Sequence, residues 1–195
     1  MSDPQGSPRD GLAARLRRRL PARRTYLKAL HWTVVPFFIW FLIVTPDDVR
    51  RVGAWAVQLH SVFGLIFVSL ALLWTGDLLW RGLASRPGPK LRGWARHIHR
   101  PLHLTIIWGL FGVALTGFLL GLTSSRLLFA GGVVPIAPPL GLPAMNGLAG
   151  LVHTVEFYGL ALIILFHAGF HTWRHLRLRD NSLRIMVPRR LHRFL

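Results

Sequence analysis

The chain has 195 residues, of which 52% are hydrophobic, and carries a formal net charge of +17 at pH 7. An ordinary soluble domain does not combine so much charge with a positive mean hydropathy, so the composition favours a small integral membrane protein with its charges outside the bilayer. Because the chain has no Cys, disulfides, thiolate metal sites and iron–sulfur clusters are excluded, and the 10 His residues become the main candidate metal ligands.

Four apolar stretches are long enough to cross a bilayer, which takes about 20 residues. In chain order they cover residues 27–45, 54–80, 101–121 and 151–174. Pro36 lies inside the first stretch, where neighbouring helices can satisfy the carbonyl that it frees. The sequence therefore predicts an all-α membrane protein with a bundle of four transmembrane helices.

The distribution of basic residues predicts the orientation of this bundle. Of the 24 Lys and Arg residues, all but Arg50, Arg51 and Arg126 lie in the N-terminal tail, in the 81–100 connection or after the fourth span. The positive-inside rule then places both termini and the 81–100 connection in the cytoplasm. Since the arginines flank apolar spans, membrane topology explains the basic charge better than binding of nucleic acid.

A single four-helix domain is expected over residues 25–180, between two basic cytoplasmic tails at 1–24 and 181–195. The N-terminal region does not resemble a cleavable signal peptide, because its apolar segment is too long and lacks a small-residue cleavage site. The 122–150 connection is rich in Gly and Pro, and we expect it to fold over the outer face without forming a helix.

Four histidines are expected at two depths in the predicted spans, so that they form two pairs. His153 and His167 are 14 residues apart, so on one helix they share a face and lie about 21 Å apart along its axis. Because successive spans alternate in direction, His60 is expected at the outer level with His153, and His31 at the inner level with His167. Two imidazoles at each level suit bis-histidine ligation of haem iron, whereas zinc takes three or four ligands.

A less specific interpretation remains open for each of these features. An intramembrane histidine can also hold helices together by hydrogen bonding, although ionisable residues at such depth are usually functional. Gly64 lies one turn after His60 and leaves room for a macrocycle or for helix packing. The same two roles are open for the glycines of the third span, Gly109, Gly112 and Gly117.

Several segments resemble the bacterial cytochrome b561 family of four-helix, di-haem membrane cytochromes, over about residues 25–190. The fourth span, with its two histidines 14 residues apart, carries the most specific part of the resemblance. The other segments are KALHW (28–32), QLHSVFG (58–64), HLTIIWGLFGVALTG (103–117) and RDNSLRIMVPRR (179–190).

The resemblance implies two b-type haems, with the iron ligands carried over onto His31, His60, His153 and His167. It also implies a location in the bacterial cytoplasmic membrane and electron transfer between an outer-face donor and the quinone pool. Some family members are described as oxidising superoxide and reducing ubiquinone, whereas related cytochromes are membrane subunits of hydrogenases or dehydrogenases. The chain is thus expected to be a self-contained oxidoreductase or an electron-carrying subunit with a protein donor, and a haem-free scaffold or transporter is the third alternative.

Further residues are expected around the cofactors. Two adjacent histidines often follow the fourth span in the family, but Arg174 and His175 stand here, which puts a site built on that pair in doubt. His103 is expected to contact a haem propionate or an iron ligand rather than the iron itself. Glu156 is expected to bond a neighbouring histidine or to relay protons.

Charged residues at the two faces allow two interpretations each. A basic rim at the inner face offers partners for haem propionates or a quinone, or it serves only as a positive-inside anchor. Arg50, Arg51 and Arg126 at the outer face could steer an anion such as superoxide, although the neighbouring Asp47 and Asp48 weaken this argument. The residues of the basic rim are Arg96, His97, His99, Arg100, His171, Arg174 and His175.

Overall fold

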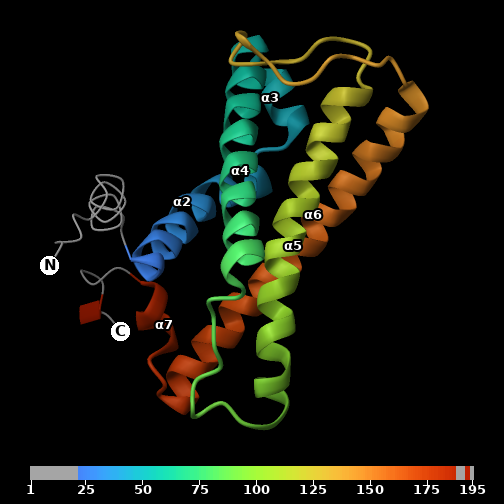
Figure 1. Ribbon diagram of the computed structural model, residues 1–195. Coiled ribbons are helices and arrows are strands. Elements are labelled where there is room, and N and C mark those ends of the chain that lie inside the picture. Colours follow the sequence, from blue (N-terminus) through green and yellow to red (C-terminus); the bar gives the residue numbers. More distant parts are fainter. Residues whose placement is uncertain (1–21, 188–191, 194–195) are drawn as a thin grey trace, which may run out of the picture.

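The computed structural model describes residues 22–187 and 192–193 and contains four long helices (Figure 1). Each of them is long and apolar enough to cross a membrane, so the predicted four-helix membrane bundle is confirmed. Most of the predicted tail 1–24 lies outside the described residues, as do residues 188–191 and 194–195 of the predicted tail 181–195. The four helices are α2 (Arg23–Ile43), α4 (Ala54–Arg81), α5 (Gly93–Thr123) and α6 (Pro143–Trp173).

Short elements lie at the two ends of the bundle (Figure 1). At one end, α3 (Pro46–Val52) begins with a capping box, in which Thr45 and Asp48 exchange hydrogen bonds. These bonds from the Thr45 side chain and backbone hold the pKa of Asp48 below its usual range. The opposite end carries η1 (Arg174–Leu178), a π-helical continuation of α6, and α7 (Ser182–Met186).

The connection between α5 and α6 differs in part from the prediction. It contains a two-stranded hairpin, in which β1 (Phe129–Ala130) pairs with β2 (Val134–Pro135). Gly131 and Gly132 turn the chain between them with φ angles of 62° and 76°, which glycine adopts without strain. The expectation that 122–150 contains no helix is wrong for residues 143–150, because α6 begins at Pro143, where proline at the first turn favours helix initiation.

Helix ends follow the hydropathy pattern only where the helix ends at the membrane surface. The second span matches α4 to within one residue. In contrast, α5 begins at Gly93, eight residues before the predicted span, because the polar segment 93–100 continues the helix beyond its apolar part. Hydropathy identifies the part of a helix that suits lipid, and it does not detect such polar extensions.

The four helices share one apolar core in the middle of the bundle. Phe38 of α2 stacks on Phe157 of α6 with ring centroids 5.0 Å apart, and Phe67 of α4 lies against Phe38 at 6.4 Å. On the outer surface, Leu79, Leu162 and Leu165 are each about 70% exposed. Such exposed leucines on the spans suit contact with lipid acyl chains.

Glycines on α5 allow close approach of α6. An added Cβ at Gly109 would lie 2.8 Å from Leu160 Cδ1, and one at Gly112 would overlap the Glu156 carboxylate. At Gly117 it would lie 3.3 Å from the His153 ring. These three glycines therefore serve helix packing. At Gly64, in contrast, an added Cβ would meet nothing within 4 Å, so space remains beside His60.

Polar contacts join the helices at the end of the bundle that the sequence predicts to be cytoplasmic. Arg23, at the start of α2, forms an ion pair with Asp77 near the end of α4 at 2.7 Å. The α7 segment packs beside α2, where Trp32 Nε1 donates to the Met186 carbonyl at 2.7 Å and Lys28 Nζ donates to the Val187 carbonyl at 3.0 Å. The first helix and the C-terminal segment therefore meet at the same end of the bundle (Figure 1).

Candidate functional site

The four histidines of the predicted tiers come from three helices: His31 from α2, His60 from α4, and His153 and His167 from α6. The His60 ring is close enough to His153 for their charges to interact electrostatically. The same holds for His167 and His31. Each predicted pair thus lies within electrostatic range, and its role as a pair of haem ligands stays a prediction.

Three of these imidazoles are half-buried, and each has a buried nitrogen that forms no hydrogen bond. Nothing in the described part of the chain provides a hydrogen-bond partner for Nδ1 of His31, His60 or His167. Aromatic rings surround them instead: the Phe41 ring lies edge-on to His60 at 4.8 Å, and the Trp74 ring lies 6.0 Å from His31. Histidines that join helices by hydrogen bonding would have partners on neighbouring helices, so this observation argues against a purely structural role.

His153 differs from the other three because its ring is oriented by a polar chain. Thr116 Oγ lies 2.9 Å from His153 Nδ1 and 3.1 Å from Glu156 Oε2. With the proton on Nδ1, the imidazole donates to Thr116, whose hydroxyl can donate in turn to the Glu156 carboxylate or to the Gly112 carbonyl at 3.0 Å. His153 Nε2 is then free to bind a metal, which is the arrangement that outer partners commonly impose on ligating histidines. Of the two roles expected for Glu156, bonding towards a neighbouring histidine matches the contacts.

These residues fit haem b by the chemistry of their donors. Two opposed imidazoles from different helices are the donor set of bis-histidine haem iron, and three of the four rings retain unpartnered nitrogens. Between the two tiers lies the layer of Phe38, Phe67 and Phe157, which excludes water and lowers the local dielectric constant. The residues that would hold the groups are His60 and His153 on one side of this layer and His31 and His167 on the other.

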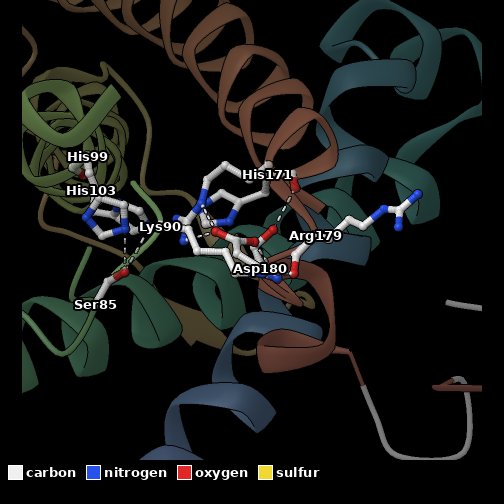
Figure 2. A network of polar contacts seen from close by, with 9 residues as sticks. Ser85, Lys90, His99, His103, His171, Arg179 and Asp180 are labelled. Atoms are coloured by element: carbon white, nitrogen blue, oxygen red, sulfur yellow. Dashed lines mark hydrogen bonds and ion pairs between the residues drawn. The ribbon is translucent and has the colours of Figure 1, made fainter. Parts of the chain in front are cut away.

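A second group of histidines lies at the inner end of α5 and α6 (Figure 2). The ring centroids of His99 and His103 are 4.4 Å apart, and the His171 ring lies 5.5 Å from His103. Ser85 Oγ, from the connection after α4, lies 3.3 Å from His99 Nε2 and 3.2 Å from His103 Nε2. The sequence places His99 in the basic rim, and in the structure its side chain is only 1% exposed.

The remaining residues of the predicted rim divide into buried and exposed ones. Arg174 is buried and binds Asp180 through its Nη2 at 2.7 Å and its Nε at 2.8 Å. Figure 2 shows the position of Asp180. Burial alone would raise the pKa of Asp180, but hydrogen bonds from Arg174 and Ser182 hold it below its usual range. Arg96 is exposed and His175 is half-buried.

The outer arginines are weak candidates for steering an anion. Arg50 Nη1 forms an ion pair with Asp47 at 3.0 Å, and both side chains are more than 70% exposed. Asp47 therefore offsets part of the positive charge of Arg50, as the sequence suggested.

Comparison with protein-family models identifies one match, to prokaryotic cytochrome b561, over residues 22–189. No curated protein and no solved structure matches the chain. The family match covers all four long helices and both histidine tiers. The chain belongs to the prokaryotic cytochrome b561 family.

Proposed function

We propose that the chain carries electrons across the bacterial inner membrane through two b-type haems, from a donor at the outer face to the quinone pool. Its family establishes the coarser part of this function, which is haem-b electron transfer in a bacterial membrane. When bound, the haem iron supplies a one-electron redox couple. The number of haems, the ligands and the two reaction partners are the parts that we propose.

The observation that supports this proposal is that four imidazoles on three membrane-spanning helices lie, pair by pair, within electrostatic range. Three of them lack any hydrogen-bond partner for their buried Nδ1 in the described chain. We therefore assign His60 and His153 to the outer haem and His31 and His167 to the inner haem. The protein holds these rings in an apolar interior, where burial and neighbouring charge tune the redox potential.

Quinone is the proposed acceptor because the inner half of the bundle offers an apolar groove. It lies between α5 and α6, and its lining includes Ile98, Leu102, Ile163 and Phe166. An isoprenoid chain that is dissolved in the membrane matches such a lining. The basic rim at the same end supplies positive charge for a reduced head group.

A self-contained oxidoreductase is favoured over a subunit because the family match and the four spans form one four-helix unit. The test uses the purified chain alone. It should show the absorption bands of reduced b-type haem, contain about two haems per chain, and reduce quinone when superoxide is generated at its outer face. If haem is present but quinone reduction appears only after a dehydrogenase is added, the subunit alternative holds. If no haem bands appear, both proposed redox functions fail.

A further inference from the structure

The histidines at the inner end of α5 and α6 form a compact nitrogen cluster. Among the described residues, His99, His103 and His171 can each present one ring nitrogen such that all three atoms lie within 4.8 Å of one another. His99 and His103 are four residues apart on α5 and so project from one face of the helix, and His171 approaches from α6 (Figure 2). None of the three belongs to the proposed pairs of haem ligands.

The hydrogen bonds of the cluster leave several ring nitrogens without a partner in the described chain. His103 Nδ1 lies 2.7 Å from the His99 carbonyl, a contact that requires the proton on Nδ1 and leaves Nε2 as the lone-pair atom. A bond of this kind is how proteins commonly orient a metal-binding histidine. His99 Nδ1 and His171 Nε2 are buried and have no hydrogen-bond partner in the described chain, although a buried polar atom without a partner is costly.

Ser85 indicates where these nitrogens converge. Its single hydroxyl lies within 3.3 Å of Nε2 of both His99 and His103, yet it has only one proton to donate. Both nitrogens therefore point into the same small space. In the tautomer that has the His99 proton on Nδ1, both Nε2 atoms carry lone pairs, and a cation at that point would bind both, with the serine oxygen or a water in a fourth position.

We propose that His99, His103 and His171 form a binding site for a divalent transition-metal ion, separate from the haem sites, for which Zn²⁺ is the probe. Imidazole nitrogens suit Zn²⁺, which binds them at about 2.0–2.1 Å and accepts three histidines plus one exchangeable ligand. The nitrogens would draw together by about an ångström from their present separation to reach tetrahedral distances. The nearby Arg174 charge is already compensated by Asp180.

Such an ion would lie beside the inner tier. The His167 ring centroid is 4.9 Å from that of His103 and 4.5 Å from that of His171. A metal at the cluster would link α5 and α6 to each other and to the connection that contains Ser85. It would also place a positive charge next to His167, which favours the reduced form of a haem bound there.

The test measures zinc and haem in the same samples. The full chain, purified with its haem and without a polyhistidine tag, is equilibrated with Zn²⁺ at micromolar concentration and analysed for both. We expect about one zinc per chain in the unchanged protein. His99→Ala should weaken zinc binding more than about 100-fold, beyond the typical effect of an outer-shell change, while the haem content stays the same.

Two further variants separate the metal site from general damage. His99→Cys retains a zinc ligand and should restore binding, which a merely structural role of His99 would not predict. His97→Ala is the matched control, because His97 is exposed on the same helix and bonds only the Gly93 carbonyl, so it should bind zinc normally. The proposal is overturned if the unchanged chain binds no zinc, if His97→Ala loses zinc as His99→Ala does, or if His99→Ala loses haem rather than zinc.

Discussion

Thr116 connects His153, a proposed iron ligand, to the carboxylate of Glu156 within the membrane. Its hydroxyl lies between His153 Nδ1 and Glu156 Oε2, and Gly117 next to it leaves room for the His153 ring. Strong hydrogen bonding at Nδ1 increases the basicity of the imidazole, which stabilises the oxidised iron. The outer tier is thus the one whose potential depends on this chain of hydrogen bonds.

We expect Thr116→Val to raise the midpoint potential of the outer haem, because valine cannot accept the proton of Nδ1. The shift should be at most about 60 mV, which corresponds to tenfold in a one-electron equilibrium. Redox titration that follows the haem absorption would measure it. Thr116→Ser, which keeps the hydroxyl, is the control and should remain near the unchanged value. An equal shift in both variants would show that packing, rather than the hydrogen bond, sets the potential.

Some residues of the candidate site could be predicted from the sequence, whereas others could not. The spacing of His153 and His167 follows from helical geometry alone, and the alternation of the spans places His31 and His60 beside them. The burial of His99 was not predicted, because hydropathy treats a histidine among arginines as part of a polar connection. In the structure it lies on α5 and contacts Ser85, 14 residues earlier in the chain.

Within α4, Gly64 leaves space beside His60 that no neighbouring atom fills within 4 Å of an added Cβ. If this space receives the edge of the outer macrocycle, Gly64→Phe should block it and reduce the haem content from about two to about one per chain. Pyridine haemochrome analysis of the purified protein would measure this.

Gly76→Phe is the matched control for this substitution, because Gly76 lies on the same helix, is exposed, and also has nothing within 4 Å of an added Cβ. It should keep both haems. Full haem content in Gly64→Phe would mean that the space beside His60 is not used by a cofactor.

At the end of α6, the ion pair of Arg174 and Asp180 holds η1 in place. Asp180→Asn would leave a buried guanidinium without its counter-charge and should destabilise the protein by about 3–5 kcal/mol. Because the pKa of Asp180 is lowered in the folded state, the ion pair contributes fully above the unfolded value near 4 and is lost as the pH falls through the folded value. Thermal unfolding in detergent at several pH values would show a difference between the proteins that is constant near neutrality and shrinks in acid.

The control for this ion pair is Asp47→Asn, which removes an exposed pair and should change stability little. A similar loss in both variants would mean that the effect does not arise from burial of the Arg174–Asp180 pair.

The extents of the helices show which parts of an element a sequence encodes. Both ends of α4 were predicted closely because an apolar run with glycine at each border begins and ends with the helix. The early starts of α5 and α6 were missed, since residues 93–100 are polar and 143–150 are rich in Gly and Pro. The β1–β2 hairpin has strands of only two residues, which is too short for an alternating pattern to be visible.

The whole molecule is a bundle whose basic residues gather at one end, which the positive-inside rule places in the cytoplasm. Because the chain lacks Cys, single cysteines can report the orientation. Val133→Cys in the hairpin should react with a membrane-impermeant maleimide added to intact cells, whereas Ala84→Cys should react only after the membrane is opened. Both positions are exposed. The opposite pattern would reverse the proposed direction of electron transfer.

The general architecture was predictable at this scale because four apolar runs and their flanking charges determine the number of helices and their alternation. The packing of the helices was not, since it depends on contacts such as Gly109 with Leu160 and Phe38 with Phe157. These contacts join helices that are distant in the sequence.

The central claim is that two pairs of imidazoles, one in each half of the bundle, each bind one haem. Its most direct test is the haem content and redox titration of His60→Ala and His167→Ala beside the unchanged protein. We expect each variant to retain about one haem, with His60→Ala losing one of the two midpoint potentials and His167→Ala losing the other. If both variants keep two haems, or if both lose the same one, the assignment of the two tiers is wrong.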